Sequence, residues 1–171
     1  MIHLNIGSNL NSKHGSRFDN ISLASNLLSN SKIKINKISN LYETPSYPNK
    51  NFPKFLNVGL TIDYHENCLC LLEEIKLIEK KIGRIRSKKN DPRIIDIDII
   101  DFKGEIKKTD KIILPHPKCH LRNFVLFPIL QIAPKWSHPI FKKNAQFLID
   151  KLSQKSRIEI TRLQKNVNIN L

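Results

Sequence analysis

Two aspartates separated by one residue, Asp96 and Asp98, carry the strongest chemical signal in the sequence. They alternate with isoleucines over residues 94–102, which is typical of a strand, and residues i and i+2 of a strand project from the same face. Two carboxylates held this close repel one another, so they need basic side chains or a hard cation beside them. Mg²⁺ suits a site that also neutralises phosphates, because it binds through one or two carboxylates and substrate oxygens. The pair therefore predicts a metal site.

Basic residues gather next to this pair. The stretch from Lys76 to Arg93 holds eight basic residues against two acidic ones, and it includes three of the seven arginines of the chain: Arg84, Arg86 and Arg93. The planar guanidinium group grips phosphate oxygens through paired hydrogen bonds. The arrangement indicates a phosphate-bearing ligand beside the aspartates.

Two further residues have both a chemical and a structural interpretation. Glu79 falls inside the apolar stripe of a helix predicted over 68–82, where a carboxylate must be paired, hydrogen-bonded or face a cleft. Alternatively, it is a helix-end glutamate that turns out to solvent or pairs with Arg86. His116 lies between two prolines, six residues before Arg122, and both side chains can donate hydrogen bonds to phosphate oxygens. A lone histidine in a proline-rich turn is more often structural.

Hydrophobic periodicity predicts the elements that position these residues. Six elements come first: strand 2–6, helix 16–30, a bulged strand 33–43, strand 54–64, helix 68–82 and strand 94–102. This β-α-β-β-α-β order predicts an α+β fold, a ferredoxin-like sandwich with an antiparallel sheet and helices on one face. A C-terminal helical extension follows, with a short extended piece near 111–114, a helix over 122–132 and a basic amphipathic helix over 144–155.

The sheet face away from the two helices is expected to be polar. Strand 54–64 turns Leu56 and its alternating apolar neighbours toward the helices and places Phe55 and Asn57 on the other face, together with the two aspartates. Such a face can simply be solvated. An aromatic ring, an amide and two acids on one surface also suit a ligand site.

Length and composition narrow the class of protein. The chain has 171 residues, no internal repeat and no linker, so we predict a single domain over residues 1–171. Its 29 Lys and Arg against 15 Asp and Glu suggest a polyanionic partner, although a codon bias toward Lys, Ile and Asn explains the charge equally well.

We expect no membrane association and a cytoplasmic location, because no apolar run approaches the roughly 20 residues that span a bilayer and no signal-peptide pattern begins the chain. The cysteines fit neither a disulfide framework nor zinc-ligand spacing, and the histidine spacing suggests no metal site.

Familiar catalytic signatures are missing from the sequence. It contains no phosphate-binding G-x-x-x-x-G-K-[ST] loop, no G-x-G-x-x-G fingerprint, no serine elbow and no kinase signature series. Phosphoryl transfer on another scaffold would depend mainly on positioning and charge neutralisation.

Eight short motifs run in one order along residues 5 to about 136. They are Gly7-Ser8-Asn9, Tyr42-x-Thr44-Pro45, Phe55-Leu56-Asn57, Gly83-Arg84-x-Arg86, Pro92-Arg93-x-x-Asp96-x-Asp98, Leu114-Pro115-His116-Pro117, Arg122-Asn123-Phe124-Val125-Leu126-Phe127-Pro128 and Ile132-Ala133-Pro134. Together they resemble the 6-hydroxymethyl-7,8-dihydropterin pyrophosphokinase family. The resemblance implies an enzyme of folate biosynthesis that moves the terminal pyrophosphate of ATP onto the hydroxymethyl oxygen of a reduced pterin and releases AMP.

The resemblance also implies roles for single residues. Asp96 and Asp98 would hold two Mg²⁺ ions that bridge the ATP phosphates. The pterin would lie between two aromatic rings and hydrogen-bond to an amide and a loop backbone, a set made of Phe55, Phe124, Asn57, Thr44 and Pro45. The nucleotide would contact Glu79, Arg84, Arg86, Arg93, Lys111, His116 and Arg122. Among all of these, the catalytic set would be Arg84, Arg93, Asp96 and Asp98.

Some features depart from the family pattern or remain open at this level. The loop over 87–91 lacks the Trp-Gly that family members often carry before Pro-Arg, and the segment from Pro45 to Pro48 is not the usual pterin loop. No general base is assigned. The implied partners are two small molecules, ATP and the pterin. Nucleic acid is not among the expected partners, and the protein is expected to act as a monomer.

Two other functions fit the sequence less well. A nucleic-acid-binding module needs two or three aromatics on its central strands, whereas here acids lie beside the single Phe55. A related fold that has lost its activity is disfavoured by the intact set of Asp, Arg, His and Asn residues.

Overall fold

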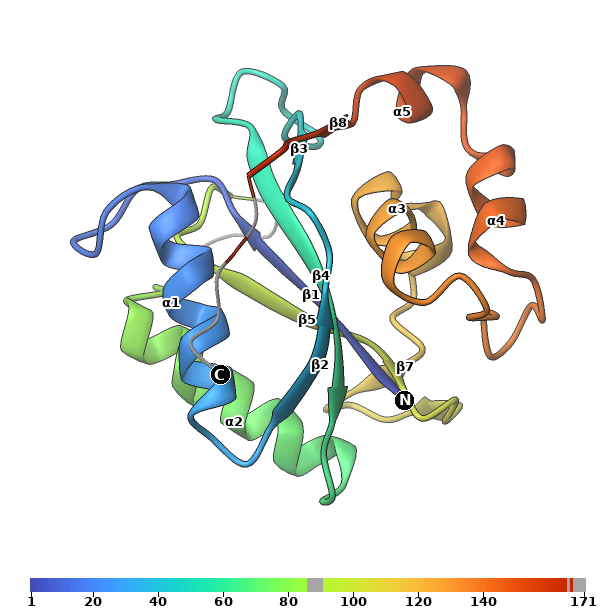
Figure 1. Cartoon of the computed structure of the whole chain (residues 1–171), viewed down its shortest axis with the longest axis horizontal. Helices are drawn as coiled ribbons and strands as arrows, with labels where there is room; N and C mark the ends of the chain where they lie inside the picture. The colour runs from blue at the N-terminus through green and yellow to red at the C-terminus, as the bar shows by residue number, and fades with distance from the viewer. Residues whose placement is uncertain (86–90, 166, 168–171) are drawn as a thin grey trace.

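A central antiparallel sheet organises the chain. The computed structural model describes residues 1–85, 91–165 and 167 (Figure 1). The strands follow the order β5-β1-β4-β3-β8, with β2 paired to β4. Their bounds are β1 Ile2–Ser8, β2 Lys34–Ile38, β3 Tyr42–Thr44, β4 Phe55–Asp63, β5 Asp96–Phe102 and β8 Thr161–Arg162, and a separate small sheet pairs β6 Lys107–Lys108 with β7 Ile113–Leu114.

The predicted β-α-β-β-α-β order is confirmed. Helices α1 (Arg17–Ser29) and α2 (Cys68–Ile82) lie together on one face of the sheet (Figure 1). The predicted strand over 33–43 is divided into β2 and β3, and its bulge is confirmed by a register shift between Ile35 and Lys37. The alternation in β4 is also confirmed, because the core beneath the two helices contains Leu56, Val58, Leu60 and Ile62.

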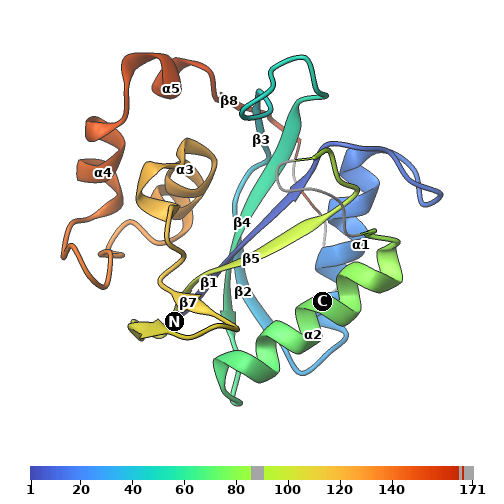
Figure 2. The same cartoon turned by 180° about the vertical axis from the view of Figure 1, so that it is seen from behind.

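The C-terminal helices lie on the opposite face of the sheet, as the view from behind also shows (Figure 2). They are α3 (Asn123–Ile132), α4 (Ala145–Lys151) and α5 (Gln154–Ile158), preceded by a short 3₁₀ helix, η1 (Cys119–Leu121). Helix α3 crosses β4 at Gly59, where an added Cβ would lie only 2.6 Å from the Cβ of Pro128. Glycine at this position therefore lets the helix approach the strand closely.

The predicted helix over 144–155 is wrong as a single element. Leu152 has extended backbone after α4, and Ser153 begins α5 by accepting a hydrogen bond from the backbone N–H of Ser156. A serine in this role is a strong N-cap, so it starts a new helix instead of continuing the old one. In the part of the chain that the structure describes, no helix combines the length and the apolar character needed to cross a bilayer.

The end of α2 sets the position of a predicted site residue. Gly83 ends the helix with φ of 103°, a left-handed conformation that glycine adopts without a steric penalty. Arg84 therefore leaves the helix axis immediately before the chain approaches β5.

Candidate active site

Both aspartates lie on one face of β5, which confirms the arrangement predicted from their spacing. Asp96 is the neighbour of Gly7 on β1, and Gly7 is the neighbour of Asn57 on β4. Residues directly opposite one another on adjacent strands point to the same face. Because neighbouring strands lie about 4.8 Å apart, the Cα atoms of Asp96 and Asn57 are separated by about 10 Å across the sheet.

Gly7 places no side chain between these two polar groups. A Cβ at this position would lie 3.0 Å from the Oδ1 atom of Asn57 and 3.5 Å from the ring of Phe55. Any larger residue would therefore crowd the amide and the aromatic ring together. The Nδ2 atom of Asn57 donates a hydrogen bond to the hydroxyl of Thr44 over 3.2 Å, and both side chains are buried.

Asp96 is neutralised by two arginines. Its Oδ1 atom lies 2.6 Å from a terminal guanidinium nitrogen of Arg84, and its Oδ2 atom lies 2.5 Å from one of Arg93. Charge-assisted contacts of this kind are the strong hydrogen bonds of proteins. They offset part of the negative charge that Asp96 presents to Asp98.

Glu79 is paired within the site, as its position in the apolar stripe predicted, whereas Arg86, the partner named in the alternative, lies outside the described residues. Its Oε1 atom accepts a hydrogen bond from the backbone N–H of Ile97 over 2.8 Å and forms an ion pair with Arg84. Burial raises the pKa of Glu79 above its ordinary value, and the charge of Arg84 opposes that shift. The glutamate therefore joins α2, the arginine and the strand that carries the aspartates.

Asp98 has a looser environment than Asp96. Its Oδ2 atom lies 3.4 Å from a guanidinium nitrogen of Arg122 and 4.0 Å from the Nε2 atom of His116. Burial, followed by the negative charge of Asp96, raises the pKa of Asp98 to about 7. Burial, followed by the charge of Arg122, lowers the pKa of His116 to about 4, so the imidazole is neutral near pH 7.

Each predicted aromatic residue lies beside one of these arginines. The guanidinium carbon of Arg93 lies 5.1 Å from the ring centroid of Phe55, and that of Arg122 lies 5.4 Å from the ring of Phe124. Both rings are partly exposed. The groups predicted to bind phosphates and those predicted to stack on a flat heterocycle are therefore adjacent.

Two of the predicted site residues are not among those that the structure shows in contact with the aspartates and arginines. Lys111 is exposed in the turn before β7, and within the described residues it forms no hydrogen bond or ion pair with the other site residues. Arg86 and the segment 87–90 of the loop noted above lie outside the described residues.

Asn9 also contacts the site residues, although the sequence alone assigns it no role. Its Oδ1 atom accepts a hydrogen bond from the backbone N–H of Arg93 over 2.7 Å. Its Nδ2 atom donates to the hydroxyl of Ser46 over 3.2 Å and to the carbonyl of Pro53 over 3.1 Å. One buried amide thus joins the loop after β1, the loop between β3 and β4, and the segment carrying Arg93. Its place in the Gly7-Ser8-Asn9 motif was the one available signal.

A cavity of about 580 Å³ opens beside Asn9, between the loop after β1 and the start of β4. It is lined by Asn9, Leu10, Asn11, Arg17, Glu43, Pro53 and Lys54. None of the residues predicted to bind pterin, phosphate or metal lines it. The candidate active site is therefore defined by the contacts of its carboxylates and arginines on the sheet face and not by this cavity.

Comparison with known proteins adds independent information. A family model described as 7,8-dihydro-6-hydroxymethylpterin-pyrophosphokinase matches residues 3–134. The chain is 37% identical over 142 residues to the 2-amino-4-hydroxy-6-hydroxymethyldihydropteridine pyrophosphokinase of Aquifex aeolicus. This match covers 83% of this chain and 86% of that protein. It is 35% identical over 139 residues to the folic acid synthesis protein fol1 of Pneumocystis carinii, covering 81% of this chain but 18% of that protein.

A solved structure supports the fold. The wild-type HPPK-DHPS of Plasmodium falciparum superposes with a TM-score of 0.69 at 16% sequence identity, over 94% of this chain and 47% of the other. The chain thus spans less than half of that protein and about a fifth of the fungal one. At this identity the likeness concerns the fold alone.

Proposed function

The chain belongs to the 7,8-dihydro-6-hydroxymethylpterin-pyrophosphokinase family, and we propose how its own residues perform the reaction of that family. The enzyme transfers the terminal pyrophosphate of ATP to the hydroxymethyl group of 6-hydroxymethyl-7,8-dihydropterin, releasing AMP, in folate biosynthesis. The observation that carries the proposal is the pair of carboxylates on β5, with arginines on both sides and partly exposed aromatic rings next to those arginines.

The proposed metal ligands are Asp96 and Asp98, as sites for two Mg²⁺ ions. Their chemistry fits, because Mg²⁺ prefers carboxylate oxygens and shares its remaining positions with water and phosphate. Among the residues that the structure describes, Asp98 has one long contact to an arginine, so its oxygens are the more available. When bound, Mg²⁺ would neutralise phosphate oxygens and so reduce the repulsion between the triphosphate and the attacking hydroxyl.

The proposed phosphate-binding residues are Arg84, Arg93, Arg122 and His116. The three guanidinium groups are already oriented by Glu79, Asp96 and Asp98, so they need little reorganisation when charge builds up on the transferred group. His116 is neutral near pH 7 and would take part by hydrogen bonding instead of by charge. Arg84 and Arg93 are the proposed catalytic arginines, because they lie at Asp96 in the middle of the group.

The proposed pterin site lies beside β4, on the opposite side of Gly7 from the aspartates. Because the amide nitrogen of Asn57 is already bonded to Thr44, its Oδ1 atom is left to accept a hydrogen bond from a ring N–H or amino group. Phe55 and Phe124 would stack on the flat ring system, and Pro45 would place the neighbouring loop backbone at its edge. The spacing of about 10 Å between the backbones of β5 and β4 then separates the bound ring from the metal site.

Further parts of this proposal come from the sequence. We propose that residues 1–171 form one pyrophosphokinase domain that acts as a monomer on its two small-molecule substrates in the cytoplasm. Lys111 and Arg86 are proposed to approach the nucleotide as well.

A direct assay tests the proposal. AMP formation from ATP should require both Mg²⁺ and the hydroxymethyldihydropterin, and Asp98→Asn should lower the turnover rate by more than about 100-fold, since even the loss of a group that only supports a metal ligand costs roughly 10–100-fold. Asp63→Asn is a matched control, because Asp63 is exposed at the far end of β4. Full activity of Asp98→Asn would contradict the assignment.

A further inference from the structure

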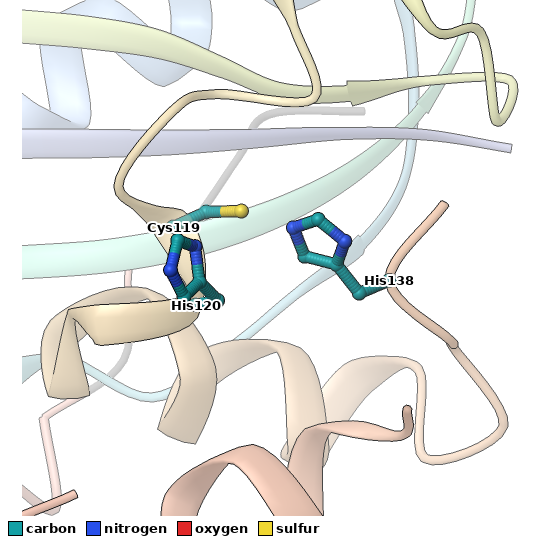
Figure 3. Close-up of side chains that lie close together, drawn as sticks. All are labelled: Cys119, His120 and His138. Carbon is teal, nitrogen blue, oxygen red and sulfur yellow. The ribbon is translucent and has the colours of Figure 1, made fainter. Parts of the chain in front are cut away.

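Three side chains with metal-binding atoms meet outside the active site. One ligand atom each of Cys119, His120 and His138 lies within 4.8 Å of the other two. Cys119 and His120 belong to η1, whereas His138 follows the end of α3. Figure 3 shows the sulfur of Cys119 pointing toward the ring of His138. The sequence spacing gave no hint of this group, because helix α3 and the turn after it bring its members together.

The group is buried and held in place by packing. Cys119 is fully buried, His138 is 2% exposed, and the Nδ1 atom of His120 is buried without a hydrogen-bond partner among the described residues. Phe141 stacks on the ring of His138 with centroids 4.5 Å apart and meets the ring of His120 edge-on at 4.8 Å. A buried ring nitrogen without a partner is costly unless something binds it.

The donor set selects the class of ion. One thiolate and two imidazoles suit Zn²⁺, whereas Mg²⁺ prefers oxygen ligands. Sites with three protein ligands commonly complete their tetrahedral shell with water. Burial raises the pKa of the Cys119 thiol and lowers that of His138, and the negative charge of Asp101 acts to raise both pKa values. Asp101 is fixed by hydrogen bonds from the indole N–H of Trp136 and the backbone N–H of Gly104. Its charge and that of a thiolate would together offset the charge of Zn²⁺.

We propose that Cys119, His120 and His138 form a binding site for one Zn²⁺ ion, distinct from the Asp96–Asp98 pair. Binding would release the thiol proton of Cys119 as the sulfur–zinc bond forms.

Zinc binding would require a small change at His138. Its Nδ1 atom accepts hydrogen bonds from the backbone N–H groups of Ile140 and Phe141 over 3.2 and 3.3 Å. Ligation through Nε2 places the ring proton on Nδ1, so these two long bonds would be given up for a metal–nitrogen bond. The backbone amide signals of Ile140 and Phe141 in a nuclear magnetic resonance spectrum should therefore shift when Zn²⁺ binds.

The site would also fix one edge of the active site. The backbone N–H of Cys119 donates to the carbonyl of His116 over 3.0 Å, and the N–H of Arg122 donates to the carbonyl of Cys119 over 3.3 Å. An ion bound at η1 would restrain the turn that presents His116 and Arg122 to Asp98. This consequence rests on the proposed function, whereas zinc binding itself does not.

The experiment is a metal titration of the whole chain without substrates. Protein freed of metal by a chelator is titrated with Zn²⁺ against a chromophoric competitor, and with Co²⁺, whose thiolate complexes absorb in the near ultraviolet. We expect one equivalent to bind with a thiolate absorption band, which Cys119→Ala should abolish while weakening Zn²⁺ binding more than about 100-fold. Cys70→Ser is the matched control, because Cys70 lies on α2 and should leave both measurements unchanged.

Three results would overturn the proposal. The protein could fail to withdraw Zn²⁺ from the competitor, the thiolate absorption band could survive Cys119→Ala, or Zn²⁺ binding could be lost in Asp98→Asn. Since the packing of Cys119 is tight, His120→Asn at a partly exposed position provides a second test and should also weaken binding. The pyrophosphokinase assay with Mg²⁺ is read separately. Activity without zinc binding would remove only the zinc site, and zinc binding without activity would remove only the proposed function.

Discussion

Replacing Asn9 by alanine should weaken both the fold and the pterin site. The substitution removes three side-chain hydrogen bonds, one from the backbone N–H of Arg93 and two to Ser46 and Pro53. A typical hydrogen bond contributes about 0.5–1.5 kcal/mol net, and a buried group left unpaired costs about 1–3 kcal/mol. The amide of Arg93 loses its acceptor, whereas the carbonyl of Pro53 keeps a 2.5 Å hydrogen bond from the hydroxyl of Ser46. We therefore expect the free energy of unfolding to fall by about 2–3 kcal/mol.

The catalytic effect should appear first in pterin binding. Asn9 anchors the loop from Ser46 to Pro53, which precedes Phe55 and Asn57 on β4. If about half of the lost free energy falls on this loop, KM for the pterin rises roughly tenfold, because 1.4 kcal/mol corresponds to a factor of ten. Denaturant unfolding measures the stability, and initial rates at varied pterin concentration measure KM.

The control for this substitution is Asn11→Ala in the same loop. Asn11 is exposed, so its replacement should change the free energy of unfolding by no more than about 0.5 kcal/mol. The reasoning is refuted if Asn9→Ala and Asn11→Ala have equal stability, or if Asn9→Ala is unstable but binds the pterin normally.

Three further predictions concern single positions. Arg93→Ala should lower kcat more than it raises KM for ATP, which steady-state rates would show; an unchanged kcat removes it from the catalytic set. Gly59→Ala should cost about 1–3 kcal/mol in denaturant unfolding, because the new methyl group would lie 2.6 Å from Pro128; an unaltered midpoint would contradict this close approach. His3 has its pKa lowered to about 4, mainly by burial, with Asp101 raising it and the N-terminal amine lowering it further. As pH falls, the unfolded state therefore binds the proton before the folded state does. The free energy of unfolding should drop by up to about 3 kcal/mol between pH 6.5 and pH 4 because of this histidine. In His3→Asn, the free energy of unfolding should depend less steeply on pH over this range.

Features with a short sequence period could be predicted from the chain alone. The alternation in β4 and β5 predicts which side chains share a face of the sheet. A period of two residues was therefore enough to place Asp96, Asp98 and Asn57 on the same face. Glu79 inside an apolar stripe had to find a partner, and Arg84 is that partner.

Features that depend on distant pairing could not be predicted in this way. Asn9 bonds to residues as far as 84 positions along the chain, and no periodicity reports such a contact. The two-residue strand β8 carries no detectable pattern, and it is held by pairing with β3. Cys119 and His138 come together only after α3 has turned the chain back, so their spacing concealed the group. The division between α4 and α5 was detectable, because Ser153 is a good N-cap residue.

The central claim is that the two aspartates of β5 bind a nucleotide through Mg²⁺ beside the pterin site. Calorimetry with a non-hydrolysable ATP analogue tests it most directly, with and without Mg²⁺ and with the pterin added afterwards, in the wild-type chain and in Asp96→Asn. The account predicts that binding of the analogue requires Mg²⁺, is lost in the variant, and is followed by binding of one pterin. Equal affinity for the analogue with and without Mg²⁺, in the wild type and the variant alike, would contradict it.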